Sequence, residues 1–291
     1  MRFKDAMERA LYGPNGFYTH QTPARHFSTS AQSPLFGRAI ARLVTSVDAA
    51  LGHPATLHIV DVGAGEGELL THIIAALLPE TAERTRPRPV ELGDPIPDHI
   101  TGILLATEWL DNIPLDLAAD GRYLNDGAPL DPADAVWISR WWPEATGIVE
   151  IGRSRDEAWA SVVGKLSAGL ALAVDYGHFL GTRPARPTLT GFKDGREVEP
   201  LLDGTTDITC HVSLDSVGEA GGHRYQVKKQ RDMLKALGVD GARPPLDLAH
   251  SSPTEYLRRL AEAGEAAMLT DPDGLGAHWW LWHEVGIRLC Q

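Results

Sequence analysis

The stretch LHIVDVGAGEGELLTHII, residues 57–74, constrains the fold more than any other part of the chain. It starts with a short apolar run that predicts a buried strand. Gly63, Gly65 and Gly67 then alternate, and apolar residues at helical spacing follow. Glycines lack a Cβ atom, so a ligand can approach the backbone closely, and the free N–H groups of such a turn point at it. The stretch therefore predicts a strand, a ligand-binding turn and a helix.

Residue 68 distinguishes between ligands for this turn. The dinucleotide fingerprint G-x-G-x-x-G requires a glycine three positions after the second one. Glu68 stands there and would place a negative charge beside a pyrophosphate. A nucleoside that carries an amino acid, such as S-adenosylmethionine (SAM), suits the D-x-G-x-G-x-G pattern better, and Asp61 would then meet its cationic amine. A tight turn with a purely structural role is the alternative interpretation.

Two further apolar runs end in polar residues. TGILLATEWLDN, residues 101–112, ends in acids that include Glu108 and Asp111, and LSAGLALAVDYGH, residues 166–178, ends at Asp175. Continuous apolar strands of this kind predict a parallel sheet covered by helices on both faces, and hence an α/β fold. Ligands of such sheets bind beyond the carboxyl ends of the strands. Together with Asp61, these strand ends predict one site.

Other segments predict the organisation around this sheet. Apolar spacing predicts helices over residues 3–12 and 34–52, the second capped by Ser33. Residues 182–253 are rich in Gly, Pro, Arg and Asp, and the aromatic run at 274–289 predicts one or two antiparallel edge strands. We therefore expect an N-terminal helical or lid segment (1–54), a ligand-binding core (55–181), an inserted cap (182–265) and C-terminal strands that complete the sheet (266–291).

Composition limits the classes of partner that we expect. The 27 Lys and Arg against 39 Asp and Glu give a net charge of −12, which argues against nucleic acid and is compatible with a basic substrate. Cys210 and Cys290 are the only cysteines, too few for a disulfide framework, so we expect a cytoplasmic protein. Because no apolar run is long enough for a membrane span, no membrane partner is expected. A homodimer remains possible.

Six ordered motifs resemble those of the MidA-like SAM-dependent methyltransferases, a family that includes a mitochondrial assembly factor methylating an arginine on a respiratory complex I subunit. They are YGPNGFYT (12–19), FSTSAQSPLFGRAIA (27–41), VDVGAGEGELL (60–70), ATEWLDNIPLD (106–116), AVDYGH (173–178) and TLTGFKDGREVEPLLDGTTDITCHV (188–212). One departure is Thr107, where the family usually has Asn or a small residue. The resemblance implies a Rossmann-like class I methyltransferase sheet with SAM as cofactor.

Candidate site residues follow from these motifs. Class I methyltransferases place an acid at the end of the second strand to hold the ribose hydroxyls, for which Glu91 and Glu83 are available. The expected cofactor-binding residues are Asp61, Gly63, Ala64, Gly65, Gly67, Glu91, Thr107 and Glu108. Expected at the substrate or in a lid over the pocket are Tyr18, Ser30, Phe36, Asp175, Tyr176, Asp207 and His211. No metal is expected.

Glu108 and Asp111 are the expected catalytic residues. A nitrogen acceptor needs a carboxylate that orients its lone pair and offsets its charge. The structural alternative is that Asp111 caps the following segment. The sequence thus predicts a SAM-dependent methyltransferase acting on an arginine or another nitrogen nucleophile of a protein. The alternatives are a small-molecule methyltransferase and a SAM-fold assembly factor without catalysis.

Several polar and aromatic residues have a structural interpretation that we favour. His211 and Asp207 are expected to make structural hydrogen bonds. His278 and His283 flank an aromatic run at a spacing that puts them on opposite faces of a strand, which disfavours a metal site. The tryptophans are expected in the core rather than in a cation-binding cage, and GRSRDEAW (152–159) resembles a solvated helix start.

Overall fold

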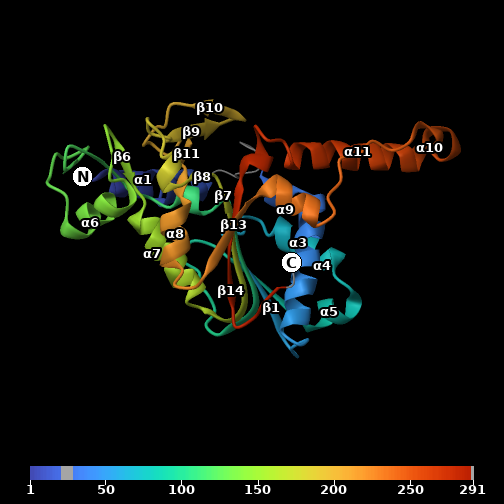
Figure 1. Cartoon of the computed structure of the whole chain (residues 1–291). Coiled ribbons are helices and arrows are strands. Elements are labelled where there is room, and N and C mark those ends of the chain that lie inside the picture. Colours follow the sequence, from blue (N-terminus) through green and yellow to red (C-terminus); the bar gives the residue numbers. More distant parts are fainter. Residues whose placement is uncertain (21–28, 290–291) are drawn as a thin grey trace.

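A six-stranded sheet in the order β13-β14-β7-β3-β1-β2 forms the centre of the computed structural model, which describes residues 1–20 and 29–289 (Figure 1). Strands β2, β1, β3 and β7 run parallel, whereas β14 is antiparallel to both β7 and β13. The strands are β1 (Leu57–Val62), β2 (Thr85–Val90), β3 (Ile100–Thr107), β7 (Leu166–Asp175), β13 (Tyr225–Lys229) and β14 (Trp279–Val285). This confirms the predicted class I methyltransferase type of α/β sheet.

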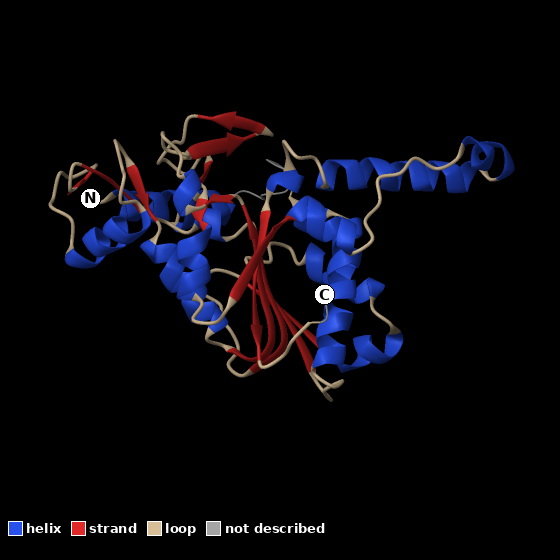
Figure 2. Ribbon diagram, in the orientation of Figure 1, coloured by secondary structure: helices blue, strands red, loops and turns tan. Residues whose placement is uncertain are grey.

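Helices cover both faces of this sheet (Figure 2). One face packs against α3 (Pro34–Ala50), α4 (Glu68–Ala76) and α9 (Gln230–Ala236), and the other packs against α7 (Arg153–Val163) and α8 (Leu214–Ala220). Successive residues of β3 alternate between the two cores: Leu105 contacts the first and Leu104 the second. Because both faces of the strand are buried, its sequence is continuously apolar.

The predicted local elements lie where the sequence places them. Helix α1 spans Phe3–Tyr12, and the Ser33 hydroxyl caps α3 by accepting from Phe36 N at 3.0 Å. The proline-broken stretch after α4 forms α5 (Pro79–Arg84) and then β2. Strand β2 tolerates Pro87 and Pro89 because it is an edge strand, where a missing N–H leaves no partner unpaired.

The C-terminal strand differs from the expectation. Strand β14 is antiparallel as predicted, but it lies second from the edge and β13 is the edge strand. Strand β13 belongs to the segment 182–265 predicted as a cap, so that segment is not a cap throughout. Its cap-like part is a small sheet of β9 (Thr190–Lys193), β10 (Arg196–Val198) and β11 (Asp207–Thr209) beyond the carboxyl end of β7 (Figure 1).

A second small layer, unpredicted, is inserted between β3 and α7. It consists of β4 (Asp116–Ala119), β5 (Arg122–Tyr123), α6 (Pro132–Trp141) and β6 (Val149–Ile151). Helix α1 packs on it, since Phe3, Met7 and Leu11 share a buried cluster with Leu115 and Leu117. The N-terminal helix is thus part of a core.

The remaining elements are short connections and one projecting pair of helices. The short elements are α2 (Phe17–His20), β8 (Gly177–His178), β12 (Val212–Ser213) and single 3-10 turns at Ser30–Gln32, Leu110–Asn112, Leu180–Thr182 and Leu275–Ala277. Helices α10 (Leu246–Ser251) and α11 (Pro253–Leu269) extend away from the body (Figure 1).

Candidate active site

The glycine turn joins β1 to α4 as predicted and is open to solvent. Gly63, Gly65 and Gly67 have φ angles of +73°, +58° and +81°, in the left-handed region that only glycine adopts readily. Gly63 and Gly65 are exposed. A Cβ atom added at Gly63 would lie 2.8 Å from the Trp109 ring, so this side chain closes one side of the turn. Near Gly65 the closest atom to such a Cβ is 3.8 Å away, which leaves room for a ligand.

The carboxyl groups of Asp61, Glu68 and Glu91 surround this turn. Asp61 is buried, and burial together with the neighbouring charges of Glu91 and Glu68 raises its pKa to about 7. Glu91 directly follows β2, and its Oε1 accepts from Gly65 N at 2.5 Å. Glu83 lies in α5, before β2 and hence at the opposite end of that strand. Glu91 is therefore the acid at the position that class I methyltransferases use for the ribose.

Glu108 directly follows β3 and adopts a left-handed backbone with φ of +52°. Its N–H donates to Val174 O at 2.8 Å, and its Oε1 accepts from Ser30 N at 2.8 Å. The side chain is only 9% exposed, and burial raises its pKa to about 8. Thr107, the last residue of β3, is buried beside it. A nonglycine residue held in this conformation indicates that the surrounding contacts determine where the carboxyl group points.

Asp175 holds the loop after β3. Its Oδ2 accepts from Leu110 N at 2.9 Å and Asp111 N at 3.2 Å, while Oδ1 accepts from Tyr176 N at 2.9 Å. These bonds satisfy the start of the 3-10 turn Leu110–Asn112. Asp175 thus has a structural role in this loop, and its expected place at the substrate stays a prediction.

Asp111 is buried, and its Oδ1 has no hydrogen-bond partner among the described residues. Burial raises its pKa, and the positive charge of Arg155 acts against that rise. A backbone hydrogen bond from Asn112 to the Asp111 carboxyl group also acts against the rise, and it is a local contact of the kind that the capping alternative describes. An unpaired buried oxygen is costly, and a ligand that donates a hydrogen bond would relieve the cost.

Arg155 is the structural centre of the site and was not predicted. Its side chain is 1% exposed, which contradicts the interpretation of GRSRDEAW as a solvated helix start. The guanidinium donates to four backbone oxygens, those of Asp111 (2.5 Å), Ile113 (3.2 Å), Cys210 (2.8 Å) and His211 (2.9 Å). It thereby joins the loop after β3 to the segment after β11. An arginine in the first turn of a helix gives no sequence signal for such burial.

Asp207 and Tyr18 connect the N-terminal block to this loop. Asp207 Oδ1 accepts from Tyr18 Oη at 3.0 Å and from Asn112 Nδ2 at 2.9 Å, and burial raises its pKa to about 7. Tyr12 stacks on Tyr18 with ring centroids 5.4 Å apart. Asp207 therefore makes structural hydrogen bonds as favoured, although to side chains of two distant segments.

His278 is a second residue that sequence reasoning did not assign to the site. It is fully buried, and neither ring nitrogen has a hydrogen-bond partner among the described residues. Its Nδ1 lies 3.9 Å from Glu108 Oε1, and the Tyr176 ring meets it edge-on at 4.0 Å. Burial, together with Lys229 and His211, lowers its pKa to about 3, so the imidazole is neutral. The only sequence signal was its position just before the aromatic strand.

Tyr176 lies between His278 and His211. The ring of His211 stacks on Tyr176 at 6.0 Å, and His211 is exposed. Its backbone N–H donates to Thr188 Oγ1 at 2.8 Å, whereas no hydrogen bond of its ring is present among the described residues. Tyr176 thus connects buried His278 with exposed His211, and the assignment of Tyr176 and His211 to the substrate side stays a prediction.

The lid hypothesis is only partly compatible with the structure. Ser30 is buried and joins the site through its N–H to Glu108, while its Oγ accepts from Gln230 Nε2 at 3.0 Å. Phe36 does not cover the pocket, because it is buried in the sheet core with its ring 5.8 Å from that of Trp280. The segment 21–28 between Tyr18 and Ser30 lies outside the described residues. Ala64, an expected cofactor-binding residue, is buried within the glycine turn.

The tryptophans do not form a cation cage. Trp280 and Trp282 are buried in the sheet core, and Trp137 and Trp142 in the core under the inserted layer, as favoured. Trp279 is half-buried and carries Lys229 over its ring at 3.7 Å. In the described part of the chain, no three His, Cys, Asp or Glu residues are grouped in a way that could hold a metal ion.

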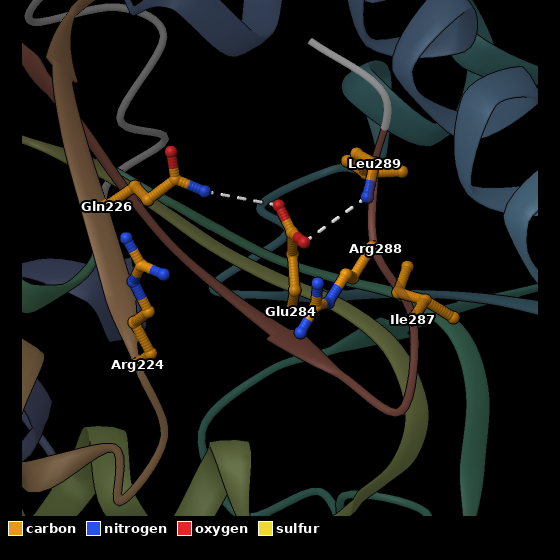
Figure 3. A pocket seen from close by; sticks show the side chains of 6 residues that line it. All are labelled: Arg224, Gln226, Glu284, Ile287, Arg288 and Leu289. Carbon is orange, nitrogen blue, oxygen red and sulfur yellow. Dashed lines mark hydrogen bonds between the residues drawn. The ribbon is translucent and has the colours of Figure 1, made fainter.

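Two surface hollows lie away from these residues. One, of about 440 Å³, is lined by Arg224, Gln226, Glu284, Ile287, Arg288 and Leu289 (Figure 3). Glu284 lies between Gln226 and Leu289 there and accepts from both. The other, of about 690 Å³, lies beside β9 and β10. Neither is lined by a predicted site residue.

Over residues 1–20 and 29–289, no helix is both long and apolar enough to cross a membrane.

Comparisons with known proteins agree with this geometry. Residues 128–232 match the model of a family described as "Putative S-adenosyl-L-methionine-dependent methyltransferase". The chain is similar to two crystal structures from Burkholderia thailandensis, each with 22% identity, a TM-score of 0.78, and coverage of 99% of this chain and 88% of the other. The first is of a "likely methyl transferase" bound to S-adenosyl-homocysteine, and the second is a native structure of a protein from the same superfamily.

A search of curated proteins found no match to this chain. Over residues 128–232 the family match agrees with the predicted resemblance, and the description of that family names the predicted enzyme class and cofactor. The two crystal structures confirm the fold.

Proposed function

We propose that this chain transfers a methyl group from SAM to a nitrogen of an arginine or another basic side chain on a protein partner. The observation that carries the proposal is the acidic character of the site. Glu108 and the unpaired Oδ1 of Asp111 both lie at the carboxyl edge of the sheet. The nearby Arg155 guanidinium donates to backbone oxygens and to the Cys210 sulfur. An acidic, buried site favours a positively charged acceptor.

The residues at the end of β1 fit the cofactor. The glycine turn offers open backbone, Glu91 stands at the position of the ribose acid, and Asp61 supplies a carboxyl group for the amine of the methionine part. The three acids around the turn match a ligand that carries both an ammonium and a sulfonium charge. SAM supplies the methyl group on a sulfonium, so the reaction is a direct in-line displacement.

The residues at the end of β3 act on the acceptor. Glu108 accepts a hydrogen bond from the attacking nitrogen and so points its lone pair at the methyl group. A nitrogen that took the methyl group of SAM would have a proton to lose, and the Glu108 carboxylate would receive it. The pKa of about 8 in the ligand-free protein makes Glu108 a better proton acceptor than an exposed carboxylate. Neutral His278 lies beside Glu108, with its Nδ1 3.9 Å from Glu108 Oε1, and the Tyr176 ring meets the imidazole edge-on.

The test is transfer of labelled methyl from SAM to soluble proteins and to small metabolites, assayed separately, with wild type and Glu108→Gln side by side. Label in a protein, lost in Glu108→Gln, supports the proposal. Label in metabolites alone indicates the small-molecule alternative. SAM binding without any transfer indicates an assembly factor without catalysis. A cytoplasmic location and the absence of nucleic-acid and membrane partners stay predictions.

A further inference from the structure

The central sheet has two edge strands, β2 and β13, and their sequences treat the exposed edge differently (Figure 1). An edge strand offers unpaired main-chain groups to other chains, and proteins often block such an edge with proline. Strand β2 carries Pro87 and Pro89, whereas β13, with the sequence YQVKK, has no proline. One edge of the sheet is thus blocked by its sequence, and the other keeps all its N–H donors.

The register of β13 with β14 determines which main-chain groups of β13 point out of the sheet. Gln230 N donates to His278 O at 2.8 Å, in continuation of that register. Residues opposite each other in an antiparallel pair alternate between pairs that exchange hydrogen bonds and pairs that do not. Tyr225, Val227 and Lys229 are therefore of the second kind, and their N–H and C=O groups point away from β14. In the described part of the chain, β14 is the only strand that pairs with β13.

Two basic side chains of β13 lie on one face of the strand. Lys228 is opposite Trp280 of β14, which lies in the core that α3 and α9 cover. Opposite residues share a face of the sheet, so Lys228 points to this side, and the alternation of side chains puts Arg224 there too. Both residues are exposed, and neither has an ion pair among the described residues. This side of the edge therefore carries uncompensated positive charge.

The hollow of about 440 Å³ lies on the same side of β13 (Figure 3). Arg224 enters it from β13 and Arg288 from the segment after β14. Within the described ranges, Arg288 too has neither an ion pair nor a hydrogen bond. The acid among the lining residues, Glu284, accepts from Gln226 Nε2 and from Leu289 N, each at 3.2 Å. The hollow thus has two guanidinium groups and one carboxylate, and the carboxylate is bonded to uncharged donors.

We propose that β13 binds an extended acidic segment of a partner protein, which adds to the central sheet as a further strand. The outward main-chain groups of Tyr225, Val227 and Lys229 form its ladder hydrogen bonds. Arg224 and Arg288 pair with its Asp or Glu side chains. In this mode of recognition main-chain hydrogen bonds provide affinity, and a pocket beside the strand provides selectivity.

Charge complementarity identifies the partner as acidic. The chain has a net charge of −12, yet Arg224, Lys228 and Arg288 are unpaired cations along this edge. The acids of α8 near β13, Asp215 and Glu219, each pair with an arginine of this chain. A second copy of β13 would bring like charges together, so these cations prevent self-pairing of the edge. An acidic strand is the one that fits them.

The hollow is distant from the site proposed for methyl transfer. Strand β14 ends at Val285, which is opposite Gly169 near the start of β7. Glu108 follows β3 at the carboxyl edge of the sheet, which is the other end of these strands. Binding at β13 is therefore measured independently of methyl transfer and does not rest on the proposed function.

The experiment is fluorescence anisotropy of the full chain with a fluorescein-labelled peptide of about ten residues, in which Glu alternates with Val. We expect a dissociation constant on the order of 10–100 µM, because the peptide loses conformational freedom when it binds. A peptide with Gln in place of Glu should bind at least about tenfold more weakly. Since the net charge of −12 repels an acidic peptide, preference for the Glu peptide requires a local basic site.

Charge variants localise the binding. Arg224→Glu and Arg288→Glu should each weaken binding of the Glu peptide at least about tenfold, since each reverses one charge of the hollow. Arg224→Lys keeps the charge and should bind nearly as well as the wild type. Arg88→Glu is the matched control, because Arg88 is exposed on β2, the edge strand with prolines. Circular dichroism checks that each variant is folded.

Peptides N-methylated at alternate residues test the main-chain contact. One alternate set of N–H groups faces β13 and the other faces away, so only one of the two methylated peptides should lose binding. Equal binding by both would exclude strand pairing. The proposal is also overturned if the Glu peptide does not bind the wild type at about 1 mM. Equal loss of binding in Arg88→Glu and Arg224→Glu would exclude β13 as the site.

Discussion

At the end of β1 the chain turns through Gly63, Gly65 and Gly67 within a few residues, while at the end of β3 the site is assembled from several distant segments. The glycine turn is exposed, and its one long-range carboxyl contact comes from Glu91. Around Glu108, by contrast, Ser30 reaches in from the N-terminal block and His278 from the start of β14. Local backbone geometry makes the first end, and tertiary packing makes the second.

The difference assigns separate tasks to the two ends. An open turn with free backbone suits a cofactor that must enter and leave in each cycle. A buried group of acids suits the step that needs an acceptor nitrogen desolvated and held in line. We therefore expect substitutions at the two ends to separate cofactor binding from methyl transfer.

The largest effect is expected at Arg155, which holds the β3 end together. Arg155→Met removes the donors of four backbone oxygens and leaves the buried Asp111 without its nearby positive charge. We expect the free energy of unfolding to fall by about 3–5 kcal/mol in urea titrations. Arg122→Met is the control, since the exposed Arg122 also donates to a backbone oxygen, that of Gly127, at 2.8 Å. Equal, small losses for both variants would contradict the central role of Arg155.

A change at the β1 end should abolish cofactor binding while the β3 end stays intact. Gly65→Val fills the open space beside the turn, so calorimetry should show SAM binding more than about 100-fold weaker than that of the wild type. Gly127→Val is the control for backbone strain, because Gly127 has a similar φ of +67° and lies outside the site. Comparable SAM affinity in Gly65→Val and Gly127→Val would show that the ligand does not approach this turn.

At the β3 end, Glu108→Gln should lower turnover and leave SAM affinity nearly unchanged. Loss of one charge-assisted contact costs about 1.5–3 kcal/mol, so turnover should fall roughly ten- to a hundredfold. Glu91→Gln is the reciprocal variant and should weaken SAM binding instead. The comparison fails if Glu108→Gln loses SAM affinity in step with activity, which would make Glu108 a cofactor ligand.

The same residue predicts a pH dependence. Burial raises the pKa of Glu108 to about 8, so its charged form increases as the pH rises through that value, and kcat/KM should rise with it. Stability should change in the opposite sense. A carboxyl group whose pKa is raised on folding stabilises the native state below its unfolded pKa, and this contribution is lost as the pH rises through the folded pKa. The ligand-free protein should thus melt at lower temperature at pH 9 than at pH 6, and less so in Glu108→Gln.

The smallest effect is expected at His278, where stability and activity should change in opposite directions. His278→Phe removes two unpaired buried nitrogens and should raise the free energy of unfolding by about 1 kcal/mol, while methyl transfer falls by roughly tenfold. His283→Phe is the matched control, because His283 accepts from Trp159 Nε1 at 3.0 Å and its loss leaves that donor unpaired. That variant should be destabilised. A destabilised His278→Phe with normal activity would mean that His278 only fills space.

The sequence alone determined the parts of this protein that depend on neighbouring residues. Strand β1, the left-handed glycines and α4 follow one another within a single stretch, and the apolar strands β3 and β7 show their two-sided burial directly in their composition. The apolar runs that end in acids were sufficient to place Glu108, Asp111 and Asp175 at one sheet edge. These predictions hold because strand direction and the position of a strand end are local properties of the chain.

Only the tertiary structure decided what those side chains do. Asp175 binds the backbone of a loop, Phe36 packs in the core, and Arg155 is buried although it stands in a helix start with many charged residues. His278 enters the site because β14 pairs antiparallel with β7, which brings the residue before β14 to the carboxyl edge of the sheet. Whether a polar side chain is buried, paired or left unpaired depends on segments far away in the chain, and no local pattern records which segments these are.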